Sequence, residues 1–179
     1  ETVENSLRRL QTDYIDLFYI HFPDEQTPKY EAVGELHRLK EEGKIRSIGV
    51  SNFSMDQLRE GNKDGYIEVI QSGYNLFKRD AEDDLIPYSL ENNISFIPYF
   101  PLASGLLTGK FSPNSTFEDG RAKNPLFQGD AFIQNLNKVD ELKAIANNKH
   151  VAVSNLVLAW YLKQESIDVV IPGAKRPEQ

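Results

Sequence analysis

The sequence predicts an α/β fold built on a parallel sheet. Two observations support this: the strand-like and helical patterns of the individual segments, and the alternation of these segments along the chain. Short segments of β-branched, aromatic and other apolar residues alternate along the chain with segments of helical, amphipathic periodicity. Such alternation is typical of βαβ units, whose strands run parallel. The length of 179 residues predicts a single domain, 1–179. Five strands of this kind form either an open doubly wound sheet or part of a barrel, and periodicity does not distinguish the two.

The individual elements follow from the same pattern. Strands are predicted at 14–20, 45–50, 67–71, 94–98 and 169–171. Helices are predicted at 2–10, 29–42, 54–60, 80–92, 130–148 and 154–165. Ser54 and Ser154 are the expected N-caps of their helices, Gly43 is the expected stop of helix 29–42, and an acidic cluster begins helix 80–92. The stretch 100–129, rich in Gly, Pro, Ser and Asn, is long for a connection, and such loops are usually functional or disordered.

Composition restricts the class of function. Lys plus Arg is 20 and Asp plus Glu is 27, so the net charge is −7 and no basic stripe offers a nucleic-acid or membrane surface. No run of about 18 apolar residues predicts a membrane span, and residues 1–10 have the pattern of a polar helix rather than a signal peptide. The absence of cysteine fits a cytoplasmic protein. No cluster of His, Asp and Glu predicts a metal site, and His37 and His150 are expected at the surface.

Polar, aromatic or glycine residues directly follow each predicted strand. They occur in the segments 21–24, 51–53, 71–75, 99–105 and 173–176. Because ligands bind at the carboxyl ends of parallel strands, these segments predict one lined rim. The run from Ser104 to Lys110 is not a phosphate-binding P-loop, because only three residues separate Gly105 from Gly109 and Phe111 replaces the required Ser or Thr.

Four segments resemble the aldo-keto reductase superfamily, most closely its bacterial general-stress-type branch: YIDLFYIHFPD, GKIRSIGVSNF, IPYFPLASGLLTGKF and IPGAKRPEQ. They occur in the family's order and approximate spacing across essentially the whole chain. The resemblance implies a (β/α)8 TIM barrel, of which this chain holds strand four to strand eight. An N-terminal portion of roughly 100 residues would then be absent, by the usual size of such barrels. Five strands without their partners would expose edges and an inner face, so this span alone is expected to be unstable.

The resemblance implies NADPH-dependent reduction of aldehydes or ketones to alcohols by hydride transfer, on a small-molecule carbonyl substrate. The proton donor would be a tyrosine in the absent portion, with its lysine and aspartate. His21 would orient and polarise the carbonyl oxygen as a hydrogen-bond donor. The alternative for His21 is a structural histidine bonded to backbone. The alternative for the protein is a regulatory partner that retains NADPH without turnover, as potassium-channel β subunits do.

The resemblance also implies the residues of the cofactor site. Ser51, Asn52 and Gln71 would bind the nicotinamide carboxamide, and the ring of Tyr99 would form a wall beside it. The pyrophosphate would meet the backbone of Phe100, Pro101, Leu102, Ala103 and Ser104, with Lys110 and Arg121 as cations. Lys175 and Arg176 would meet the adenosine 2′-phosphate, favouring NADP over NAD roughly tenfold or more. Gly173 and Ala174 would lie beside them, and Gln179 would reach the adenosine. The alternatives are strand-end capping for Ser51 and Asn52, barrel packing for Tyr99 and a solvated charge for Arg121, while Trp160 is expected in the core.

Overall fold

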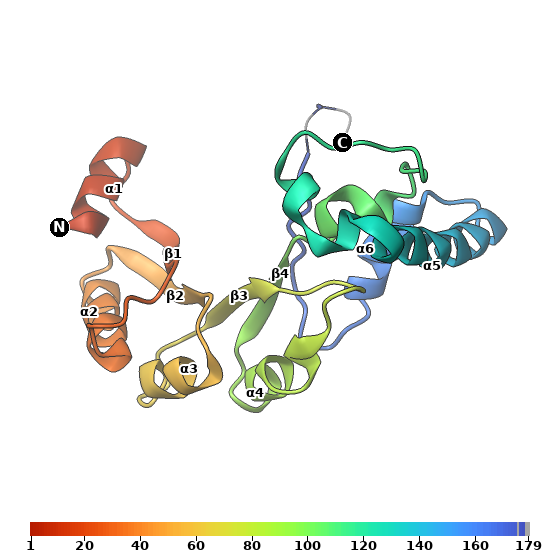
Figure 1. Ribbon diagram of the computed structural model, residues 1–179. Coiled ribbons are helices and arrows are strands. Elements are labelled where there is room, and N and C mark those ends of the chain that lie inside the picture. The colour runs from red at the N-terminus through yellow and green to blue at the C-terminus, as the bar shows by residue number, and fades with distance from the viewer. Residues whose placement is uncertain (175, 178–179) are drawn as a thin grey trace. The chain divides into compact units, whose positions relative to one another are not determined.

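The computed structural model describes residues 1–174 and 176–177 (Figure 1). Its strands are β1 (Ile15–Ile20), β2 (Ile45–Ser51), β3 (Val69–Gly73) and β4 (Ser95–Tyr99). Its α-helices are α1 (Thr2–Leu10), α2 (Lys29–Glu41), α3 (Met55–Gly61), α4 (Leu85–Glu91), α5 (Gly129–Asn148) and α6 (Val153–Tyr161). Four 3-10 segments complete the order: η1 (Asp80–Glu82), η2 (Ala103–Thr108), η3 (Gly120–Lys123) and η4 (Pro125–Phe127).

The strands form one sheet in the order β1-β2-β3-β4. Strand β1 pairs parallel with β2, with Ile15 opposite Ile45, and β2 pairs parallel with β3, with Gly49 opposite Val69. Helix α2 packs against both β2 and α3 (Figure 1). The predicted alternation of strands and helices over a parallel sheet is therefore confirmed. The carboxyl ends of neighbouring strands lie at one edge, where ligands bind in such sheets.

The chain divides into two compact units. The first unit holds Glu1–Ser72 and Asp80–Ile97, and the second holds Gly73–Arg79 and Pro98–Gln179. The largest fully buried apolar side chains of the first unit are those of Val33, Ile45, Ile48, Val50, Leu58 and Phe96. Those of the second are Tyr74, Leu106, Leu107, Val139, Val157 and Tyr161. Each unit thus has a core of its own, and the expectation of a single domain over 1–179 stays a prediction.

Two of the expected helix boundaries are confirmed in the first unit. Ser54 caps α3: its hydroxyl accepts a hydrogen bond from Gln57 N at 3.3 Å, and the Gln57 side chain accepts from Ser54 N at 2.9 Å. This reciprocal pair is a capping box. Gly43 follows the end of α2 with a φ of 75°, a conformation that glycine adopts without a steric cost. The turn therefore leads directly from α2 into β2.

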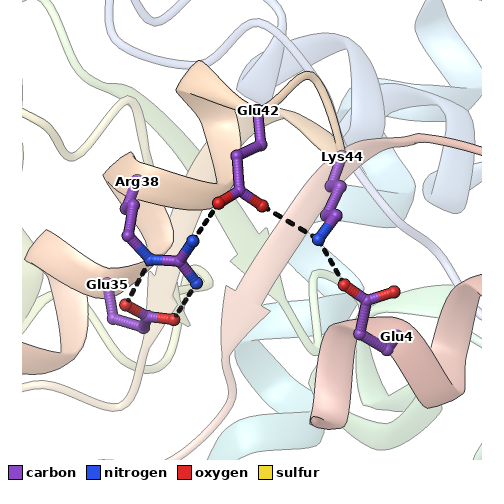
Figure 2. A network of polar contacts seen from close by, with 5 residues as sticks. All are labelled: Glu4, Glu35, Arg38, Glu42 and Lys44. Carbon is purple, nitrogen blue, oxygen red and sulfur yellow. Dashed lines mark hydrogen bonds and ion pairs between the residues drawn. The ribbon is translucent and has the colours of Figure 1, made fainter.

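A chain of ion pairs links α1, α2 and the residue before β2 (Figure 2). Arg38 donates to Glu35 through Nε at 2.9 Å and through a terminal nitrogen at 2.6 Å, and it also pairs with Glu42. Lys44 pairs with Glu42 at 2.8 Å and with Glu4 of α1. The hydrogen bond from Lys44 holds the pKa of Glu4 below its usual value, and the hydrogen bond from Arg38 does the same for Glu35.

The two depressed pKa values predict a loss of stability in acid. A carboxyl whose folded-state pKa is lowered contributes stability above its unfolded pKa, about 4.3 for Glu. That contribution disappears as the pH falls through the lower folded-state value. We therefore expect the free energy of unfolding, measured by urea denaturation, to decrease below about pH 4. In Lys44→Met, which removes the partner of Glu4, the decrease should be smaller; the same decrease in both proteins would contradict the assignment.

The prediction of one continuous helix over 80–92 is wrong, because the segment forms two separate elements, η1 and α4. The Asp84 side chain accepts a hydrogen bond from Leu85 N at 2.5 Å and so starts a new helix. Pro87 then falls in the first turn of α4, where its missing N–H leaves no intrahelical bond unmade. Likewise, strands β3 and β4 end two and one residues later than predicted.

Two predictions near the C-terminal end are also wrong. Helix α6 spans Val153–Tyr161 rather than 154–165, and its N-cap is Ala152, whose ψ of 149° is extended, rather than Ser154. Residues 169–171 form no strand, because within the described part of the chain they pair with no neighbouring strand. Val169 and Ile171 are instead 48% and 42% exposed. The irregular stretch 100–129 is confirmed as a connection, which contains η2, η3 and η4.

Candidate functional site

Four of the expected site residues come together at the strand ends of the first unit. Ser51, at the end of β2, is buried and donates its hydroxyl hydrogen to the Gln71 carbonyl at 3.0 Å. The Asn52 amide donates to the His21 carbonyl at 3.0 Å and to the Ser51 hydroxyl at 3.1 Å. Asn52 adopts a left-handed backbone conformation with a φ of 61°. These bonds tie together the carboxyl ends of β1, β2 and β3, which is the capping role considered above for Ser51 and Asn52.

The imidazole of His21 is exposed at the end of β1. The His21 backbone carbonyl is held by Asn52, whereas the imidazole itself makes no hydrogen bond within residues 1–174 and 176–177. Its ring lies 4.6 Å from that of Phe22, between centroids, and Phe22 is 65% exposed. The alternative of a histidine whose ring is bonded to backbone therefore has no support among the described residues. The backbone is fixed while the ring is available to a ligand.

Tyr19 is a further polar group beside this cluster, and the sequence reasoning missed it. An added Cβ at Gly49 would lie 2.5 Å from Tyr19 Cε1, so only glycine lets the ring lie against β2. Burial raises the pKa of Tyr19, and a hydrogen bond between the Tyr19 and Gln71 side chains acts in the opposite direction. Alternation along β1 puts Tyr19 on the same face as His21. That period-2 relation is the signal that could have found it.

In the second unit, the ring of Tyr99 lies over Gly73. A Cβ added at Gly73 would lie 2.9 Å from Tyr99 Cε2 and 3.1 Å from Cζ. The ring of Phe100, 64% exposed, meets that of Tyr99 edge-on at 5.3 Å between centroids. Gly73 therefore supports a flat aromatic surface at the end of β4. The sequence placed Gly73 at a strand end without this role.

The segment after Tyr99 has an unusual backbone. Phe100, Ala103 and Ser104 have φ values of 53°, 46° and 55°, and Gly105 follows at 94°. Left-handed conformations cost non-glycine residues of order 1–3 kcal/mol each and cluster at functional sites. Successive right- and left-handed residues also turn their N–H groups into a concavity that binds anions.

Lys110 and Arg121 both lie close to the ring of Phe111, which itself lies beside Gly105. The ring centroid of Phe111 lies 5.1 Å from Lys110 Nζ and 5.5 Å from Arg121 Cζ. A Cβ at Gly105 would lie 3.6 Å from Lys110 Cε, so the lysine stem passes beside the left-handed backbone. Arg121 donates to both carboxylate oxygens of Asp119, at 2.9 and 2.7 Å, and this pairing raises the pKa of the guanidinium. Arg121 is thus paired rather than a solvated charge.

The remaining predicted residues are at the C-terminal end. Gly173 and Ala174 are exposed, as is Arg176. Lys175 and Gln179 lie outside the described residues. The structure therefore brings His21, Ser51, Asn52 and Gln71 together in the first unit. In the second unit, Lys110 and Arg121 both lie near the ring of Phe111, which contacts the position of Gly105.

Two further properties concern metals and membranes. Within residues 1–174 and 176–177, no group of three or more His, Asp and Glu side chains is placed to hold a metal ion. Among the helices that the structure describes, none has both the length and the apolar character needed to cross a bilayer.

Comparison with known sequences identifies relatives along the whole chain. The profile of the Aldo/keto reductase family matches residues 1–179. The aldo-keto reductase YhdN of Bacillus subtilis is 42% identical over 182 residues, which cover 100% of this chain and 55% of that protein. The NADH-specific methylglyoxal reductase of Escherichia coli is 35% identical, with 100% of this chain and 56% of that protein covered. The chain spans about half the length of the curated relatives it matches.

Solved structures agree with the sequence relatives. A glycerol dehydrogenase from Gluconobacter oxydans superposes with a TM-score of 0.94 at 38% identity, covering 99% of this chain and 54% of that one. An aldo/keto reductase from Klebsiella pneumoniae, solved with NADP and acetate, gives a TM-score of 0.70 at 31% identity, covering 96% of this chain and 53% of that one. The expected (β/α)8 fold is confirmed, and the parallel sheet with alternating helices corresponds to part of the barrel. The chain belongs to the aldo/keto reductase family.

Proposed function

We propose that the protein is an NADPH-dependent oxidoreductase that reduces aldehydes or ketones to alcohols. The observation that carries this proposal is the cluster at the strand ends of the first unit. There the exposed imidazole of His21, which has no hydrogen-bond partner among the described residues, lies at the same strand ends as the buried hydroxyl of Ser51 and the half-buried amide of Asn52. In hydride transfer to a carbonyl carbon, negative charge develops on the oxygen, which needs hydrogen-bond donors. The imidazole of His21 would orient and polarise that oxygen, and a tyrosine outside this chain would supply the proton.

Each unit, considered by itself, offers groups suited to one part of the cofactor. In the first unit, Ser51, Asn52 and Gln71 offer the mixed donors and acceptors that a carboxamide requires. In the second unit, the ring of Tyr99 offers a flat wall to the nicotinamide, and the segment with left-handed residues at Phe100, Ala103 and Ser104 suits an anionic pyrophosphate. Lys110 and Arg121 would add positive charge in a chain of net charge −7. NADPH when bound supplies the hydride.

The preference for NADPH rests on Lys175 and Arg176, the cations predicted to meet the 2′-phosphate. The cofactors named for similar proteins differ: one relative is named as NADH-specific, and one structural neighbour was solved with NADP. A charge-assisted bond to the 2′-phosphate contributes about 1.5–3 kcal/mol. We therefore expect kcat/KM for NADPH to exceed that for NADH by roughly tenfold or more. Arg176→Glu should reduce or reverse that ratio.

The proposal is tested by turnover of the full-length gene product. Oxidation of NADPH, followed by the absorbance of the reduced nicotinamide, is measured against a panel of aldehydes and ketones. Turnover of at least one carbonyl class supports the proposal. Tight NADPH binding with negligible turnover across the panel would instead favour the partner or sensor role. Failure to bind NADPH or NADH would overturn it.

Replacing Gly73 by alanine should weaken cofactor binding. The new Cβ would lie 2.9 Å from the Tyr99 ring, so the ring must leave its position. Forcing a side chain off its rotamer costs of order 0.5–1.5 kcal/mol, so the dissociation constant for NADPH should rise roughly threefold to tenfold. Gly34→Ala is the matched control, because its Cβ would meet nothing within 4 Å. Unchanged binding in Gly73→Ala, measured by fluorescence titration, would contradict a role for Tyr99 against the nicotinamide.

A further inference from the structure

The hydroxyl of Tyr161 joins three segments of the second unit that are distant in sequence. Tyr161 is the last residue of α6 and is 0% exposed. Its Oη lies 2.9 Å from the Tyr74 carbonyl and 3.0 Å from the Pro101 carbonyl, and it donates to both. A phenol has one hydrogen, so the two carbonyls share it. Burial raises the pKa of Tyr161, and the electrostatic effect of the nearby Tyr74 raises it further. The proton therefore stays on the hydroxyl at neutral pH.

Both carbonyls belong to segments already placed at the candidate site. Pro101 lies between Phe100 and Ala103, which have φ values of 53° and 46°. Tyr74 directly follows Gly73, which supports the Tyr99 ring. The Asn75 amide adds a second link between the same segments by donating to the Phe100 carbonyl at 3.3 Å. One buried hydroxyl therefore fixes both the start of the left-handed segment and the glycine beneath the aromatic wall.

We propose that Tyr161 is a positioning residue of the cofactor site, which holds the backbone from Phe100 to Gly105 in the conformation that receives the pyrophosphate. This inference rests on the proposed function. A left-handed backbone on non-glycine residues persists only when its surroundings fix it. Without the shared hydrogen bond, the segment relaxes toward ordinary conformations, and binding of the cofactor must restore the left-handed one at the expense of affinity.

The packing of Tyr161 separates the role of the hydroxyl from that of the ring. The ring meets Tyr74 edge-on at 5.8 Å and Trp160 at 4.8 Å between centroids. Tyr161→Phe keeps the ring and these contacts and removes only the hydroxyl. Val157, on the same helix and 1% exposed, contributes packing without a hydrogen bond. Val157→Ala is therefore a control for general loss of stability in α6.

The test compares the affinities for two ligands in the full-length wild type, Tyr161→Phe and Val157→Ala. For Tyr161→Phe, the dissociation constant for NADPH should rise about tenfold, while kcat at saturating NADPH changes little. Adenosine 2′,5′-bisphosphate, which lacks the pyrophosphate, should bind with an affinity unchanged within about twofold. Val157→Ala should lower the melting temperature without changing either constant. Equal weakening of both ligands, or weakening of NADPH binding in Val157→Ala, would overturn the proposal.

A measurement without cofactor separates this inference from the proposed function. Amide hydrogen exchange at Ala103, Gly105 and Leu107, whose N–H groups donate to carbonyls of this loop, should accelerate in Tyr161→Phe and stay at the wild-type rate in Val157→Ala. If the wild-type protein binds no dinucleotide, the proposed function fails, and the exchange data still report whether the hydroxyl orders the segment. Exchange in Tyr161→Phe at the wild-type rate would overturn the positioning role even in a protein that binds NADPH.

Discussion

Replacement of His21 by alanine is expected to lower kcat/KM for carbonyl reduction by about 10²–10³, the usual effect of losing one donor to a developing oxyanion. The imidazole is exposed and bonds to no other group of the described chain, so its removal leaves no buried polar group unsatisfied. Asn52 binds the backbone carbonyl of residue 21, which alanine retains. The fold and the dissociation constant for NADPH should therefore stay close to those of the wild type.

The matched control is His150→Asn, which removes an exposed imidazole far along the sequence. His150 has a φ of 55°, and asparagine tolerates this left-handed conformation better than other residues with a side chain. Its kcat/KM should equal that of the wild type. If His21→Ala reduces carbonyls within about twofold of the wild-type rate, the imidazole is not the polarising donor.

Replacement of Phe96 by alanine should lower the free energy of unfolding by about 3–5 kcal/mol, the usual range for a buried phenylalanine. Phe96 is the second residue of β4 and is 0% exposed, so alanine leaves a cavity in the core of the first unit. A loss of this size is a large part of the 5–15 kcal/mol that stabilises a typical domain. Urea denaturation of the full-length protein measures it through the transition midpoint.

Phe22→Ala is the control for Phe96→Ala, because it deletes the same side chain at a position that is 65% exposed. Its effect on the free energy of unfolding should lie within about 0.5 kcal/mol. A loss below about 1 kcal/mol in Phe96→Ala would show that β4 is not packed as described.

Local patterning was sufficient to predict most of the fold. The strands near Ile15, Ile45 and Ser95 and the helices α1, α2, α3 and α5 follow from apolar periodicity and from caps such as Ser54. The break between η1 and α4 was missed because it depends on one side chain, that of Asp84, in a run of equally acidic neighbours. Segment 169–171 has strand-like composition, but a strand also requires a hydrogen-bonding neighbour, which composition does not reveal.

The site was predictable to the extent that it lies at strand ends. His21, Ser51 and Gln71 could be assigned to one edge because parallel strands end together. The tie from Asn52 to the His21 carbonyl could not, because it depends on a left-handed φ at Asn52. The role of Tyr161 could not be predicted either, because its hydrogen-bond partners are 87 and 60 residues away in the sequence. From the sequence alone, one can say only that a tyrosine hydroxyl on an apolar helix needs a hydrogen-bond acceptor when it is buried.

The left-handed backbone at Phe100, Ala103 and Ser104 has a consequence for how this loop can change during evolution or design. Glycine would be the conformationally easiest residue at each of these positions, yet all three carry side chains. Substitutions toward glycine would relieve strain in the folded chain while giving the unfolded chain more freedom. Because these two effects on stability oppose each other, selection for thermal stability alone would not favour one residue type at these three positions. Selection for retained dinucleotide binding is the pressure that would keep its shape.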